Sequence, residues 1–190
     1  MATFSTLDFG IDGGIARITL NRPDAANGIS MQLAQELLQA SLACRCSPQV
    51  RAVLLTGKGR MFCAGGDLNS FVENAANLEG FIKELTTYLH AAIANFAHMR
   101  APLIIAVNGA AAGAGFSLAA CGDLVLAARS AKFSMAYTGA GLVPDVRLEI
   151  AHFGRGRRRF DIEIAGQGNP ELVREDFRGA GCRIEREPLA

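Results

Sequence analysis

Two short apolar runs constrain the fold of this chain more than any other feature. Residues 52–56 (AVLLT) and 103–107 (LIIAV) contain no charged side chain and are too short for core helices. Runs of this kind are typical of strands that are buried on both faces of a parallel sheet. Each run is followed by a loop of small residues, 57-GKGRMFCAGGDL-68 and 108-NGAAAGAG-115.

The segments around these runs alternate between strand and helix patterns. A helix is predicted from Met31 to about Cys46 with Ser30 as its N-cap, and a longer one over 78–96 that stops before Pro102. The remaining predicted elements are a hairpin of residues 4–9 and 15–20, a helix at 116–121, a strand at 124–127 and an extended piece at 132–134. This order predicts an α/β fold in which helices cross over between parallel strands.

Charge and cysteine content exclude several classes of function. A formal net charge of +1 argues against a nucleic-acid-binding or membrane-surface protein. The N-terminal residues lack a signal-peptide pattern, and no apolar stretch is long enough for a transmembrane helix, so a cytoplasmic location is expected. The five cysteines are scattered, with no second ligand pair near Cys44 and Cys46, so no metal is predicted.

The two small-residue loops are the candidate site. Small side chains let a ligand approach the main chain, and the first amides of a helix point outward without partners. If the loops at Gly65-Gly66 and 113–115 converge, their amides can hold an oxyanion such as the enolate of a thioester. The alternative is a tight strand-to-helix turn. The second loop is not a dinucleotide-binding fingerprint, because Leu118 stands where the third glycine of G-x-G-x-x-G is required.

Six motifs together carry a resemblance to a known family. They are 20-LNRP-23 with Asn27, 62-FCAGGDL-68, 107-VNGAAAGAG-115, 121-CGD-123, 131-AKF-133 and 141-GLVPD-145. In this order they resemble the crotonase superfamily, the enoyl-CoA hydratases and isomerases. The resemblance implies a ββα spiral core, an acyl-CoA thioester as substrate, no cofactor beyond the coenzyme A of that substrate, and a homotrimer or hexamer.

The resemblance also assigns residues. The amides of Gly66 and Ala114 would bind the thioester oxygen, and Asp67 would brace its loop rather than react. The other residues expected at the substrate are Ala64, Leu68, Gly113, Ser117 and Tyr137. Arg22, Lys58 and Arg60 are candidates for the phosphates of coenzyme A, with plain solvated charges as the alternative.

The acid/base residues decide the reaction. Family hydratases use two glutamates, and this chain has Ser117 and Tyr137 at those positions, neither of which can activate water near neutral pH. A carboxylate stands instead at Asp145, where one group of family isomerases keeps its single acid. We therefore expect an enoyl-CoA isomerase-like enzyme with Asp145 as its base. The alternatives are a hydratase, a catalytically inactive fragment, and, for Asp145, a helix N-cap after a proline turn.

A change of composition near Asp145 divides the chain. Charged residues number 20 in residues 1–145 and 17 in residues 146–190, and all bases of the second part are arginine. The resemblance stops at the same place, where the family's closing helices would begin. We therefore predict a crotonase-like acyl-CoA-binding core over 1–145 and an Arg/Glu-rich divergent tail over 146–190. We expect the tail to be unrelated to the family or an out-of-frame extension.

Overall fold

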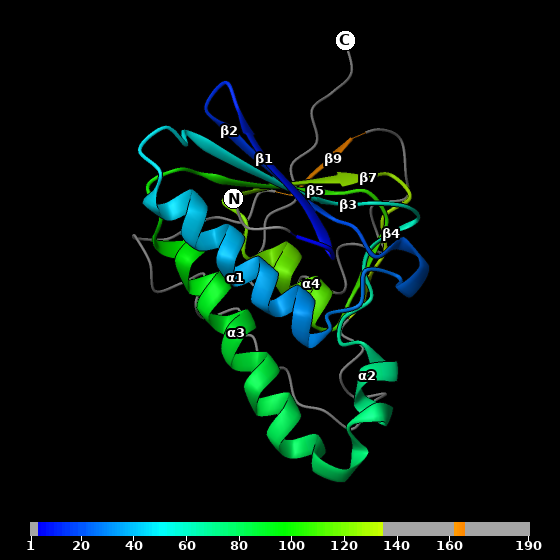
Figure 1. Cartoon of the computed structure of the whole chain (residues 1–190). Helices are drawn as coiled ribbons and strands as arrows, with labels where there is room; N and C mark the ends of the chain where they lie inside the picture. Colours follow the sequence, from blue (N-terminus) through cyan, green and yellow to red (C-terminus); the bar gives the residue numbers. More distant parts are fainter. Residues whose placement is uncertain (1–3, 135–161, 166–190) are drawn as a thin grey trace.

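Two sheets form the framework of the chain. The computed structural model describes residues 4–134 and 162–165. The larger sheet has the strand order β1-β2-β3-β5-β7-β9 and the smaller one the order β4-β6-β8 (Figure 1). The strands of the larger sheet are β1 (Leu7–Asp12), β2 (Ile15–Leu20), β3 (Ala52–Gly57), β5 (Leu103–Val107), β7 (Leu124–Ala128) and β9 (Ile162–Ala165). Those of the smaller sheet are β4 (Met61–Cys63), β6 (Ala110–Ala112) and β8 (Phe133–Ser134).

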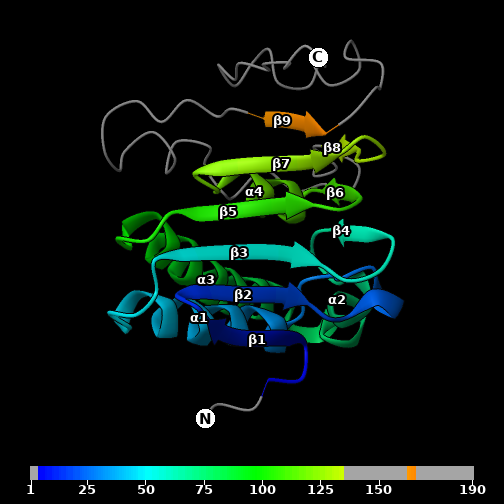
Figure 2. The same cartoon turned by 90° about the horizontal axis from the view of Figure 1, so that it is seen from above.

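Parallel pairing dominates both sheets. The hairpin of β1 and β2 is antiparallel, and every other described strand pair is parallel, as in the register of Val53 with Leu103. Figure 2 shows the strands of the larger sheet side by side, in front of the helices. This arrangement confirms the α/β prediction with its parallel strands.

From β3 to β8, successive strands along the chain alternate between the two sheets. After β3 it enters the smaller sheet as β4, after β5 as β6 and after β7 as β8. β4 and β6 pair directly, so the loops that follow them start from neighbouring strands. Gly109 is required at this step, because a Cβ there would lie 2.0 Å from the Arg60 carbonyl oxygen.

The helices lie on one side of the larger sheet (Figure 1). They are α1 (Met31–Cys46), α2 (Leu68–Glu73), α3 (Leu78–His98) and α4 (Ala114–Ala120), with 3-10 turns at Pro23–Ala25 and Ala75–Asn77. The predicted start of α1 is confirmed, since the Ser30 hydroxyl accepts a hydrogen bond of 3.3 Å from the Leu33 N–H. The long helix is also confirmed, and it ends at His98, two residues later than predicted.

Burial of the central strands differs from the prediction. Val53, Leu55 and Ile105 are fully buried, but the alternating residues Leu54 and Ile104 are only half-buried. The prediction of strands buried on both faces was therefore wrong. The described helices cover a single face of the sheet, which leaves the other face less enclosed.

Other elements were missed or shifted. β1 begins at Leu7 rather than residue 4 and continues through Gly10, and its turn is Gly13-Gly14, where both φ angles are positive. The small strands β4 and β6 lie inside the two predicted loops, and no element was predicted for the helix α2. Of the predicted tail, only β9 belongs to the described residues, and it pairs in parallel with β7.

Candidate functional site

A cavity of about 540 Å³ lies where the two small-residue loops meet. It is bounded by the turn at 24–29, by the loop after β4, by α3 and by the start of α4. Six of the residues predicted for the site line it: Ala64, Gly66, Asp67, Leu68, Gly113 and Ala114. The convergence of the two loops, which was the condition for an oxyanion site, is therefore present.

The Gly66 amide is oriented by a parallel bridge to Ile29. The Ile29 N–H donates to the Gly65 carbonyl at 2.7 Å, and the Asp67 N–H donates to the Ile29 carbonyl at 3.1 Å. The bridge therefore uses the carbonyl before Gly66 and the N–H after it. Because Gly66 does not bond to Ile29 itself, its own N–H points away from Ile29. Within residues 4–134 this N–H makes no hydrogen bond, so it is available to a ligand.

The Ala114 amide is the first of helix α4. The Phe116 and Ser117 N–H groups return to the Gly113 carbonyl at 3.0 and 3.1 Å, which leaves the Ala114 N–H without an intrahelical acceptor. The two loops are in close contact, since a Cβ on Gly65 would lie 3.4 Å from the Ala114 nitrogen. Gly65 has a φ of +99°, a conformation that also favours glycine. Two outward-pointing amides therefore border one cavity.

Asp67 holds the loop in this shape. Its Oδ1 accepts hydrogen bonds from the Asn69 and Ser70 N–H groups at the start of α2, and its Oδ2 pairs with Arg22 Nη2 at 2.8 Å. Burial alone raises the pKa of this carboxyl, but the hydrogen bond and charge of Arg22, together with the Ser70 and Asn69 N–H groups, outweigh it and hold the pKa below its usual value. A carboxylate stabilised in this way is a weak base, which fits the bracing role predicted for Asp67.

Arg22 lies inside this arrangement rather than at the cavity mouth. Its Nη1 donates to the Gly28 carbonyl while its Nη2 holds Asp67. These contacts argue against the role in binding coenzyme A phosphates that the sequence predicted for Arg22. Lys58 and Arg60 are exposed in the turn between β3 and β4 and do not line the cavity, so their role stays a prediction.

Asn27 fixes the turn that carries these groups. It is fully buried at a φ of +52°. Its Nδ2 donates to the carbonyls of Lys58 and Met61 at 2.9 and 2.8 Å, and its Oδ1 accepts from the Arg22 N–H at 2.9 Å. One side chain thus satisfies three main-chain groups of two segments.

The cavity has an apolar wall that the sequence reasoning missed. It consists of Ile29, Phe71, Ile82, Leu85 and Leu89. The α3 members follow helical spacing, which predicts the helix but does not show that this face lines a cavity. Lys83, also on α3, lines the cavity too and pairs with Glu79 one turn earlier, Nζ to Oε1 2.5 Å.

Besides Arg22, Lys58 and Arg60, three more predicted site residues are not placed at the cavity. Ser117 is buried in α4 and does not line it. Tyr137 and Asp145 lie outside the described residues.

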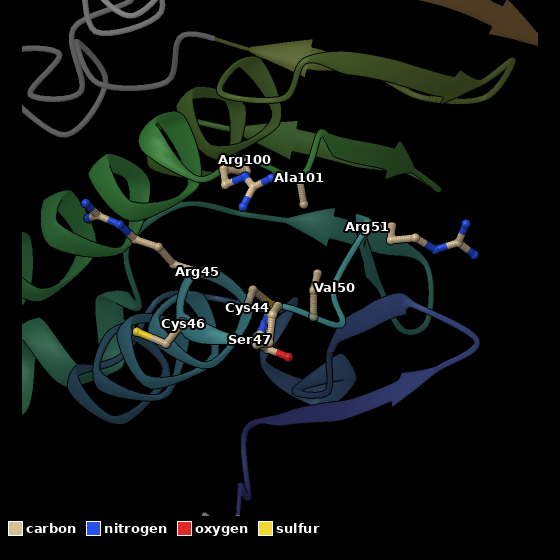
Figure 3. A pocket seen from close by; sticks show the side chains of 9 residues that line it. Cys44, Arg45, Cys46, Ser47, Val50, Arg51, Arg100 and Ala101 are labelled. Carbon is tan, nitrogen blue, oxygen red and sulfur yellow. The ribbon is translucent and has the colours of Figure 1, made fainter.

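A second cavity of about 460 Å³ lies at the C-terminal end of α1 (Figure 3). Arg45, Arg51 and Arg100 border it, but their guanidinium groups point in different directions (Figure 3). Arg45 bonds to Asn95 Oδ1 at 2.8 Å and Arg51 to the Gly13 carbonyl at 3.0 Å. The three charges therefore do not gather around one ligand position.

Metal-binding groups and membrane-spanning helices are both absent from the part of the chain that the structure describes. None of its His, Cys, Asp and Glu side chains form a group of three that could hold a metal ion. None of its helices is long and apolar enough to cross a membrane.

Two linked, mainly parallel sheets with two small-residue loops at one cavity are the arrangement of a crotonase-like protein. The sequence model of the enoyl-CoA hydratase/isomerase family matches residues 10–152, and the chain belongs to this family. The predicted resemblance is thereby confirmed.

Individual relatives carry both hydratase and isomerase names. A Rhodobacter capsulatus protein named "Probable enoyl-CoA hydratase" is 41% identical over 143 residues, which are 75% of this chain and 54% of the relative. The 1,2-epoxyphenylacetyl-CoA isomerase of Escherichia coli is 39% identical over 71% of this chain and 52% of its own length. The chain thus spans about half the length of both. A solved enoyl-CoA hydratase/isomerase structure from Mycobacterium abscessus superposes with a TM-score of 0.72 at 34% identity, covering 77% of this chain and 57% of the other.

Proposed function

We propose that this chain binds an acyl-CoA thioester and moves a carbon–carbon double bond along its acyl chain. The observation that carries the proposal is the pair of available amides, Gly66 N–H and Ala114 N–H, at one cavity with an apolar wall. The amides suit a thioester oxygen, and the wall suits an acyl chain. Relatives named for enoyl-CoA and epoxyphenylacetyl-CoA support this substrate class.

The amides would act on the charge that develops during the reaction. When a proton leaves the α carbon of a 3-enoyl thioester, the electron pair of the broken C–H bond is delocalised onto the carbonyl oxygen, which forms a dienolate. Two fixed N–H donors stabilise that oxygen more strongly than they stabilise the neutral carbonyl. The loss of one such donor typically costs about 3–4 kcal/mol of transition-state stabilisation.

Asp145 would move the proton. As a carboxylate it takes the α proton, and as the resulting acid it returns the proton to the γ carbon, which completes the shift of the double bond. A single carboxyl group is sufficient for this transfer. Its assignment rests on the family resemblance at GLVPD, because residue 145 lies outside the described part of the structure.

The acidic side chains at the cavity support the assignment of the proton transfer to Asp145. Asp24 and Asp67 are the acidic side chains that line the cavity among the described residues. Asp67 is committed to Arg22 and to the start of α2, and Asp24 is exposed. Ser117 stands where family hydratases carry a glutamate, which supports a reaction that does not require two carboxylates.

Hydration is the second candidate, because the Rhodobacter capsulatus relative is named for that activity. Binding of acyl-CoA without turnover is the third. The homotrimer or hexamer expected from the resemblance belongs to the same proposal, and sedimentation equilibrium would test it.

One pair of assays distinguishes isomerisation from hydration. The purified chain is given a 3-enoyl-CoA and, separately, a 2-enoyl-CoA, and formation of 2-enoyl-CoA and of 3-hydroxyacyl-CoA is measured. Isomerisation without hydration, lost in Asp145→Asn, supports the proposal. Unchanged isomerisation in Asp145→Asn would remove Asp145 from the mechanism, and hydration alone would favour the second candidate.

A further inference from the structure

The Arg22 guanidinium connects the two segments that form the bridge beneath the candidate site. Its Nη1 donates to the carbonyl of Gly28, the residue before Ile29. Its Nη2 donates to Asp67 Oδ2 at 2.8 Å, and Asp67 is the residue after Gly66. One planar group therefore spans the Ile29–Gly66 bridge from one segment to the other.

The bridge sets the direction of the Gly66 amide through a single peptide unit. The Ile29 N–H bonds to the Gly65 carbonyl at 2.7 Å, and this carbonyl belongs to the same peptide unit as the Gly66 N–H. In a trans peptide the C=O and N–H point in opposite directions. Holding the carbonyl against Ile29 therefore turns the N–H away from it.

The local sequence does not hold this peptide unit by itself. Glycine has the widest choice of backbone conformation, and Gly28, Gly65 and Gly66 surround the bridge. The orientation must therefore come from contacts with other segments. Arg22 supplies one to each side of the bridge, and its own backbone is fixed, because its N–H donates to Asn27 Oδ1 at 2.9 Å.

We propose that Arg22 is a positioning residue, which fixes the direction of the Gly66 amide by joining Gly28 to Asp67. The proposal rests on the proposed function, since it assigns Arg22 to the same oxyanion-binding amide. Arginine suits this position because its planar fork can donate to two acceptors at once in a fixed geometry, whereas lysine is a single flexible point charge.

A purely structural role for Arg22 makes a different prediction. An ion pair at this degree of exposure stabilises the fold modestly, and its loss would weaken all ligands alike. A positioning role affects only the ligand state that carries negative charge on the thioester oxygen. The test therefore compares one ligand that forms an enolate with one that does not.

The experiment uses acetoacetyl-CoA, whose enolate has its own ultraviolet absorption band, and butyryl-CoA, which does not ionise. Both are titrated into the whole chain and into Arg22→Gln, Arg22→Lys and the control Arg17→Gln, whose arginine is exposed on β2. We expect Arg22→Gln to lower enolate affinity and turnover of 3-enoyl-CoA by about 100-fold, because donor misplacement acts on the charged state. Butyryl-CoA affinity and KM should stay within about twofold.

Each outcome decides the proposal. The enolate affinity and turnover of Arg22→Lys should lie between those of the wild-type chain and Arg22→Gln. If thermal unfolding shows that Arg22→Gln does not fold, Arg22→Lys replaces it in every comparison. Equal losses for both ligands, or no loss, would overturn the positioning role while leaving the proposed function intact. If the wild-type chain does not favour the enolate of acetoacetyl-CoA, the oxyanion site itself is refuted, and the role of Arg22 with it.

Discussion

Replacing Gly115 by alanine tests whether contact between the two loops sets the candidate site. A Cβ on Gly115 would lie 2.2 Å from the Cys63 carbonyl oxygen and 2.7 Å from the Cys63 Cβ. Ordinary contacts of this kind are about 3.5 Å, so the first turn of α4 must withdraw from β4 by about 1 Å. Helix α4 begins at Ala114, and its outward-pointing amide must move with that turn.

The expected result has a kinetic part and a stability part. A displacement of this size reduces turnover of 3-enoyl-CoA by about 100-fold, because the amide no longer meets the developing charge. Crowding at Cys63 should also lower the free energy of unfolding by about 1–3 kcal/mol. The rate of isomerisation measures the kinetic effect, and urea unfolding measures the effect on stability.

The matched control is Gly10→Ala. Gly10 lies on β1, and an added Cβ would meet nothing within 4 Å. If Gly115→Ala lost stability but turned over 3-enoyl-CoA as fast as the Gly10 control, the proposed dependence of the site on this loop contact would be refuted.

Three further predictions concern the framework. Burial raises the pKa of Glu36, but hydrogen bonds from Thr6 and Ser5 outweigh it and lower the pKa overall; Glu36→Gln should therefore cost about 1.5–3 kcal/mol at pH 7 in urea unfolding. That difference should shrink as the pH falls through the lowered pKa of folded Glu36, and a cost that did not change with pH would contradict it. Ser30→Ala should cost about 1 kcal/mol by removing the cap of α1, and an unchanged unfolding midpoint would contradict that role. Burial raises the pKa of the Cys63 thiol to about 12, so iodoacetamide at pH 8 should label exposed Cys46 and not Cys63 in the folded chain, as peptide mass mapping can show.

Much of the larger sheet could be predicted because its elements carry their own local signals. The runs that became β3 and β5 are apolar and bounded, and Ser30 marks the start of α1 through a contact only three residues away. Such features are decided within a few residues, so a single sequence displays them.

The smaller sheet could not be predicted in this way. β6 consists of three alanines, which have no preference for strands, and it is extended because β4 and β8 pair with it on either side. Pairing between distant segments decided its conformation, and the local pattern gave only a small-residue loop.

The same difference between local signals and contacts of distant segments applies to the candidate site. The glycines of both loops were found because a backbone site needs small residues, and the sequence shows those directly. The contact between Arg22 and Asp67 was not found, because the two residues lie 45 positions apart and the charge of Arg22 is equally compatible with a phosphate. Leu85 and Leu89 repeat at helical spacing whether they face a core or a cavity, so their place in the wall required the structure.

The alternation of the chain between its two sheets makes the core a short stack of turns, similar in principle to a solenoid. Each turn contacts mainly the turns before and after it, so its stability is set by nearest-neighbour interfaces. The candidate site lies at one such interface, between the turn containing β4 and the turn containing β6. Changes in the β1–β2 hairpin can therefore weaken the stack, and they reach the Gly66 amide before the Ala114 amide, because Arg22 and Ile29 follow β2 along the chain and contact the loop of Gly66.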